Sequence, residues 1–100
     1  LSLKIMEVKT VNEEYIKPIT RFKFDVNKIK VGCAIKITNI KPGDDGSSVI
    51  MIVNGTSAIS VGENLVCDAI KTIDQDGKIY KFKADDFGGD HPNYKLEVLS

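Results

Sequence analysis

The sequence predicts an all-β domain, and three observations support this prediction. First, short runs rich in Val, Ile, Phe and Tyr alternate with polar residues, the period of two expected for strands with one buried face. Second, turn-forming residues separate these runs at short intervals along the chain. Third, no stretch sustains the 3.6-residue period of an amphipathic helix. The length of 100 residues fits one domain, residues 1–100.

Within this class we expect a small, partly open, SH3-like β-barrel of roughly six to eight short antiparallel strands. The chain is short for a seven-stranded sandwich with an N-terminal arm, which favours the barrel. Three features are compatible with the order of elements in an SH3-like barrel: the entry into a strongly twisted strand at Val31-Gly32, the loop at 41–48 and the short turn at 84–87. An OB-like barrel and a small β-sandwich are the alternatives.

The N-terminal quarter is expected to contribute strands that are irregular or lie at an edge. Leu3–Val11 is apolar-rich and is predicted to be a strand. The run Tyr15–Asp25 contains Pro18, which removes a ladder donor and places the segment at an edge or bend. After it, Phe22 and Phe24 alternate with basic residues and are expected to point inward.

The middle of the chain contains the most apolar segment. Val31–Ile40 alternates apolar and polar residues and is predicted to be a strand, followed by the polar loop at 41–48. Val49–Val53 is continuously apolar, so we expect it to be the most buried strand. Asn54-Gly55 is expected to end it with a turn.

Leu65–Lys83 is the best-defined element, because two apolar-rich runs flank Asp74-Gln75-Asp76-Gly77. With Gln75–Gly77 as the loop and Gly77 at positive φ, Asp74 faces Lys78. The predicted ladder then pairs Ile73 with Ile79, Thr72 with Tyr80, and Ile70 with Phe82.

Alternation along this ladder predicts one core face and one solvated face. The inward set is Val66, Asp68, Ile70, Tyr80 and Phe82, and the outward set is Lys71, Lys81 and Lys83. Lys71 should lie directly opposite Lys81, a like-charge pair. After the hairpin, 84–87 is expected to form one helical turn. Tyr94–Leu99 is the last strand and a candidate edge for pairing with a partner strand.

Charge and composition narrow the classes of partner. Fourteen basic groups balance fourteen acidic ones, so no net field draws the chain to nucleic acid or to a membrane. Residues 1–41 carry a net +5 and residues 42–100 a net −5. Arg21 is the only arginine, which disfavours specific nucleic-acid recognition. The abundance of Ile, Lys and Asn suits an AT-rich bacterial genome.

The compartment follows from the cysteines and the hydropathy. Cys33 and Cys67 form no close pair and lie among apolar residues, so reduced thiols and a cytoplasmic location are expected. No apolar run approaches the roughly 20 residues that span a bilayer. The alternative is an exported, processed chain, because the sequence opens at Leu1 without Met.

Catalytic and metal-binding motifs are poorly represented. His91 is the only histidine, and the sequence contains neither a nucleophile-elbow nor a phosphate-loop motif. The acidic segment Asp85–His91 is expected to be a solvated loop rather than a metal site. We therefore expect a protein that is not an enzyme and holds no cofactor.

The lysine-rich strand faces are the remaining candidate site. One group is Lys71, Lys81 and Lys83; Arg21, Lys23 and Lys36 form a second group if their strands adjoin. The sequence thus favours a non-catalytic protein-interaction or assembly module whose partner is another protein or a second copy of itself. The alternative is weak, salt-dependent nucleic-acid binding through these lysines.

Overall fold

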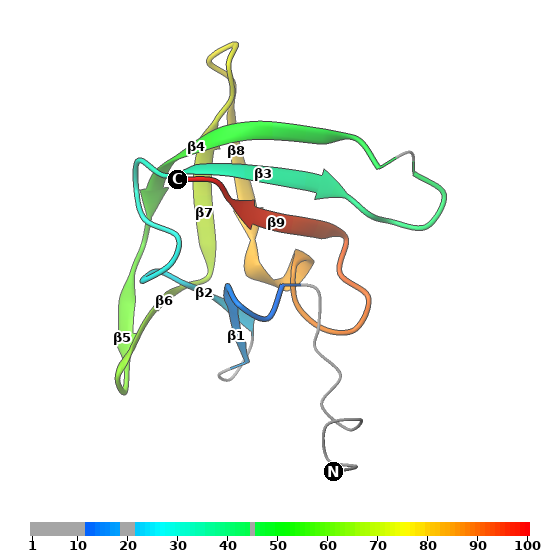
Figure 1. The fold of residues 1–100 in the computed structure, drawn as a ribbon. Helices are drawn as coiled ribbons and strands as arrows, with labels where there is room; N and C mark the ends of the chain where they lie inside the picture. The colour runs from blue at the N-terminus through cyan, green and yellow to red at the C-terminus, as the bar shows by residue number, and fades with distance from the viewer. Residues whose placement is uncertain (1–11, 19–21, 45) are drawn as a thin grey trace.

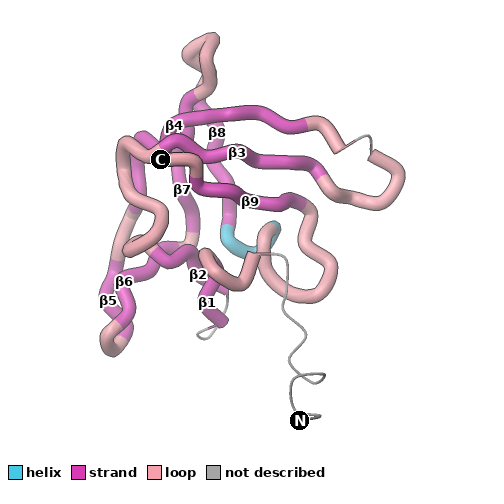
Figure 2. Tube along the Cα trace, viewed as in Figure 1, coloured by secondary structure: helices cyan, strands magenta, loops and turns pink. Residues whose placement is uncertain are grey.

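The computed structural model describes residues 12–18, 22–44 and 46–100 (Figure 1). The described residues form nine strands and one 3-10 helix, and strands and loops make up nearly all of the trace in Figure 2. In chain order the elements are β1 (Ile16–Pro18), β2 (Phe22–Asp25), β3 (Ala34–Asn39), β4 (Ser48–Thr56), β5 (Ile59–Val61), β6 (Asn64–Cys67), β7 (Ala69–Ile73), β8 (Ile79–Lys83), η1 (Ala84–Asp86) and β9 (Tyr94–Val98). The all-β prediction is confirmed, with one strand more than the largest number expected.

The strands pair antiparallel in two sheets. One has the order β1-β2-β6-β5 and the other the order β8-β7-β4-β3-β9. The structure is therefore not a closed barrel. The single helical turn expected at 84–87 is present as η1, which follows β8 directly.

One long, bent hairpin connects the two sheets. Its upper part is the pair β4–β7 in the five-stranded sheet, and its lower part is the pair β5–β6 in the four-stranded sheet (Figure 1). Gly62, at φ 62°, lies in the turn where Val61 pairs with Asn64. Asp68 separates β6 from β7 at the bend.

This bend corrects two predictions about the inward face. Val66 is fully buried but belongs to the four-stranded sheet, so it shares no sheet face with Ile70. Asp68 is exposed rather than inward. The alternation rule assumes one continuous strand, and it fails where the chain leaves one sheet for the other.

The core lies between the two sheets and draws on both. Its buried members are Ile16, Phe24, Val26, Ile29, Ile35, Ile37, Met51, Val53, Cys67, Ile70, Ala84, Phe87 and Leu96. Phe24 of β2 meets Phe87 edge-on with ring centroids 5.3 Å apart, and Phe87 in turn meets Phe82 of β8 at 5.9 Å. Such ring pairs add about 0.5–1.5 kcal/mol each beyond area burial. The aromatic side chains are thus used to join the sheets.

The β7–β8 hairpin agrees with its predicted register residue by residue. Ile73 pairs with Ile79, Thr72 with Tyr80, Lys71 with Lys81, and Ile70 with Phe82. Asp74 N donates to Lys78 O at 3.0 Å, and Gly77 lies at φ 84°. The carboxylate of Asp74 accepts from the backbone N of Asp76 and of Lys78. A short side chain that bonds its own turn thus fixes the loop.

The structure shows that β4 is not the most buried strand. Met51 and Val53 are buried, but Ile50 is 46% exposed and Ile52 is 41% exposed. A continuous apolar run predicts burial on both faces only where a second layer covers the outer face. The Asn54-Gly55 pair is not a turn: it lies inside β4, where the pairing register with β7 shifts.

Asn12 occupies part of the free edge of β9. Its side chain is 1% exposed, and its Nδ2 donates to Phe87 O at 2.7 Å and to Tyr94 O at 2.8 Å. Its Oδ1 accepts from Leu96 N at 2.9 Å. The amide therefore occupies the hydrogen-bonding positions that a neighbouring strand would take between Tyr94 and Leu96.

Two predictions fall on residues outside the described ranges: the strand Leu3–Val11 and the placement of Arg21. Within the described ranges, none of the helices is long and apolar enough to cross a membrane.

Candidate functional site

Three of the predicted site lysines lie together on the outer face of β7 and β8. Lys71 is directly opposite Lys81, and Lys83 is opposite Ala69, one diagonal step away. All three side chains are exposed. We call Lys71, Lys81 and Lys83 the lysine flank. Adjacent like charges are mildly unfavourable on a sheet, so the flank does not serve the stability of the hairpin.

The second predicted lysine group does not form. Its strands β2 and β3 belong to different sheets, so Lys23 and Lys36 are not neighbours on one face. Lys23 is largely buried and forms an ion pair with Asp68. Lys36 lies on the outer face of β3, opposite Glu97 of β9. The condition under which this group was expected, adjoining strands, is not met.

Two shallow grooves run beside the lysine flank. One, of about 460 Å³, is lined by Gly55, Thr56, Ser57, Asp68, Ala69, Ile70, Lys71 and Lys81. The other, of about 320 Å³, is lined by Phe22, Lys23, Asp68, Ala69, Lys81, Lys83 and Asp85. They meet at Asp68, Ala69 and Lys81, and four lysines outnumber two aspartates along them. The excess of lysines suits the grooves to an acidic ligand. Lys23 is already paired with Asp68, so the other three lysines would contact such a ligand.

Phe22 is the aromatic side chain in these grooves, and Gly88 determines how closely the chain passes it. A Cβ at Gly88 would lie 2.3 Å from Cγ of Phe22, too close for any residue larger than glycine without a shift of the ring. Phe22 is therefore packed beneath the backbone of the 88–89 segment. It is poorly placed to stack freely on a nucleobase.

An exposed apolar row crosses the outer face of the five-stranded sheet. Adjacent strands place its members side by side: Ile79 (β8), Ile73 (β7), Ile52 (β4), Ala34 (β3) and Leu99, whose N donates to Ala34 O at 2.8 Å. We call these five residues the apolar row. Ile79 is 60% exposed and Leu99 is 49% exposed. Ile50 lies next to Ile52 on the same face.

Apolar side chains aligned across the outer face of a sheet make this row a candidate binding surface. Sequence reasoning missed the row because its members come from five separate segments. Each segment shows only one or two apolar residues in the outward phase. Ile50, Met51 and Ile52 are all apolar, so the sequence could not show that Met51 is buried while its two neighbours are exposed.

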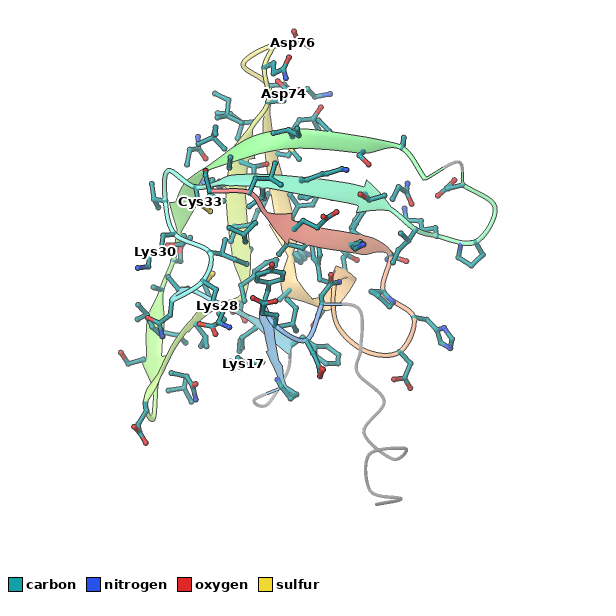
Figure 3. All side chains as sticks on the ribbon, viewed as in Figure 1. Lys17, Lys28, Lys30, Cys33, Asp74 and Asp76 are labelled. Carbon is teal, nitrogen blue, oxygen red and sulfur yellow. The ribbon has the colours of Figure 1, made fainter. Side chains whose placement is uncertain are left out.

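Polar groups flank the apolar row on both sides. On one side lies the lysine flank. On the other lie Lys36, Glu97 and the tip of the β7–β8 hairpin, where a shallow notch is lined by Ser48, Val49, Ile50, Asp74, Gln75 and Asp76. Figure 3 shows Asp74 and Asp76 at the projecting tip, with Lys17, Lys28 and Lys30 far from it. The row thus has a basic side and a side that ends in an acidic tip.

The two cysteines differ in burial, and the setting of Cys67 disfavours a nucleophile. Both thiols are free; Cys67 is fully buried and Cys33 is half-buried. Burial raises the pKa of the Cys67 thiol, while hydrogen bonds from the backbone of Ser57 and Ala69 partly oppose this. A raised pKa keeps the thiol protonated and unreactive at neutral pH.

The acidic segment after η1 shows no arrangement suited to a metal. Within the described residues, no three His, Cys, Asp or Glu side chains gather as metal ligands would. Asp86 Oδ1 instead accepts from Asn93 Nδ2 at 3.2 Å, which closes the loop. His91 is exposed and lines none of the three grooves described above.

Comparison with known proteins adds no relative: no family model, no curated protein and no solved structure matches this chain.

Proposed function

We propose that this chain is a non-catalytic protein-interaction module that docks through the outer face of its five-stranded sheet. The observation that carries the proposal is the apolar row, which leaves Ile79, Ile52 and Leu99 in contact with solvent. Burying such side chains in an interface contributes about 25 cal/mol per Å². The lysine flank supplies orientation and favours a partner with acidic groups beside its apolar contact.

The details of the two sheets support the same proposal. The core uses the aromatic rings and the inward side chains, so the outer face is not needed to hold the domain together. Asn12 occupies the β9 edge between Tyr94 and Leu96, which leaves face-to-face docking as the favoured mode over strand addition there.

A photo-cross-linking residue placed at position 79 tests the proposal. Position 59 is the matched control, because Ile59 is 52% exposed and lies in β5 of the other sheet. After irradiation of cells that produce the chain, we expect protein adducts from position 79 and few from position 59. Mass spectrometry of each adduct identifies the protein attached.

Equal labelling from both positions would show non-specific contact and contradict the proposal. Absence of any protein adduct from position 79, with the variant folded and present at the wild-type level, would also contradict it.

The four lysines around the two grooves favour a second candidate, weak binding of single-stranded nucleic acid. Each phosphate contact adds about 0.7 to the slope of log affinity against log salt for a single strand. Replacing Lys71, Lys81 and Lys83 together by Gln should lower this slope by roughly 2. A labelled oligonucleotide that shows no binding at low salt would eliminate this candidate.

We further propose that the two sheets form a partly open, SH3-like arrangement, since the β4–β7 and β5–β6 hairpin curls from one sheet into the other. The composition supports a bacterial origin.

A further inference from the structure

We propose that the partner on the apolar row is a second copy of this chain, related to the first by a two-fold axis that runs along the row. This inference rests on the proposed function, because it names the occupant of the same face. It follows from the register of the strands, the distribution of charge on either side of the row, and the neutrality of the chain.

The register defines what such an axis brings together. With the axis along the row and across the strands, each row residue packs on its own counterpart, so Ile52 meets Ile52 and Ile79 meets Ile79. Residues on one side of the row in one copy then cover the opposite side in the other. Lys71, two residues from Ile73 on the basic side, lies over Gln75 of the second copy.

This arrangement places opposite charges together. Lys81 and Lys71 of each copy lie over the hairpin tip of the other, where Asp76 is exposed. Gly55, which is beside Lys71, receives Ile50 of the second copy on a position without a side chain. A two-fold axis parallel to the strands would instead bring both Lys36 and Glu97, which are paired on β3 and β9, over the acidic tip, so their charges would offset each other. Charge complementarity therefore selects the axis along the row.

Size and net charge are compatible with a reversible dimer. Five strands spaced about 4.8 Å apart, covered over three rows of outward side chains, give a face of roughly 24 Å by 20 Å. Two such faces bury about 1,000 Å², the lower limit for a specific interface. The formal net charge of zero removes the overall repulsion that would oppose two copies meeting.

Sedimentation equilibrium of the full chain tests the proposal. The protein concentration should run from about 5 µM to about 500 µM, because an interface of this size is expected to associate within that range. We expect a monomer–dimer equilibrium. Ile52→Lys and, separately, Ile79→Lys place lysines against each other at the axis and should abolish the dimer. Ile59→Lys, equally exposed on the other sheet, should leave the equilibrium unchanged.

A charge exchange tests the axis itself. Lys81→Glu and Asp76→Lys should each weaken self-association about fivefold, because each variant brings like charges together twice across the axis. An equimolar mixture of the two variants should recover dimers, since a mixed pair contains two opposite-charge contacts.

The outcomes separate this inference from the proposed function. A wild-type chain that is monomeric at every concentration would contradict the proposal that the partner is a second copy of the chain. Dimers that persist in both Ile52→Lys and Ile79→Lys also overturn it, since another surface would then hold them. Adducts from position 79 with a different protein, together with a monomeric chain, would leave the proposed function intact. Absence of any adduct from that position contradicts both.

Discussion

The two faces of the five-stranded sheet contain the same kinds of side chain in opposite surroundings. On the inner face, Met51, Val53 and Ile70 pack against the second sheet and are almost fully buried. On the outer face, Ile52 and Ile79 are as apolar but remain largely exposed. Both faces come from the same strands, one residue out of phase.

The difference teaches that only a covering layer turns apolar residues into a core. The inner face has its layer in β1, β2, β6 and β5, whereas the outer face has none within the described residues. Because no described layer covers the outer apolar face, we propose that its side chains serve binding rather than the core.

The largest expected effect separates the two faces directly. Ile70→Ala on the inner face should lower the free energy of unfolding by about 2–5 kcal/mol, because it leaves a cavity in the core. Ile79→Ala on the outer face should change it by less than about 0.5 kcal/mol. Urea denaturation in dilute protein measures both. Similar losses in the two variants would mean that the outer face is part of the core.

Asn12→Ala extends the comparison to the edge of the sheet. It removes the partners of Phe87 O, Tyr94 O and Leu96 N, so we expect a loss of about 2 kcal/mol or more. Asn64→Ala, at an exposed asparagine of β6, is the matched control and should be nearly neutral. Hydrogen exchange of the Leu96 amide should accelerate only in Asn12→Ala. Unchanged exchange would show that the amide bonds do not protect the edge.

Lys71→Glu tests the register of the outer face. It replaces a like-charge pair with an opposite-charge pair across β7 and β8, which should stabilise the fold by about 0.2–1 kcal/mol at low salt. The double variant Lys71→Glu with Lys81→Glu restores a like-charge pair and should lose this gain. Thermal melts at low and high salt measure it. An equal gain in both variants would rule out a direct contact.

The smallest effect at neutral pH concerns Cys67. Burial raises its pKa in the folded state, so the unfolded chain loses the thiol proton first as pH rises. Stability from this group is fully present below the ordinary thiol pKa of about 8.5 and is lost as pH climbs toward the folded value. Cys67→Ala should therefore flatten the alkaline part of the stability profile relative to wild type. An identical slope in both proteins would contradict the assignment.

The β7–β8 hairpin at 69–83 shows how far local sequence determines structure. The positive φ of Gly77, the ladder and the pairing of Lys71 with Lys81 all followed from Asp74 to Gly77, because a short loop fixes register through local backbone geometry. The lysine flank of the candidate site was predictable for the same reason.

Features that depend on distant parts of the chain could not be predicted in this way. Whether β4 is covered on one face or two depends on a layer supplied by other strands, so Ile50 and Ile52 were expected to be buried. Asn12 had the composition of a turn, yet its amide bonds a strand more than eighty residues away. The Asn54-Gly55 pair favours a turn locally, but pairing with β7 on one side keeps it within β4.

The bent hairpin also influences how the domain unfolds and refolds. The pairs β4–β7 and β5–β6 are two parts of one hairpin, so each sheet contains only half of that hairpin. A fragment that keeps one sheet would leave half of this hairpin with no surface to cover it. The domain should therefore melt as one cooperative unit, and a cut at the bend near Asp68 should be far more damaging than an insertion at the Gly62 turn.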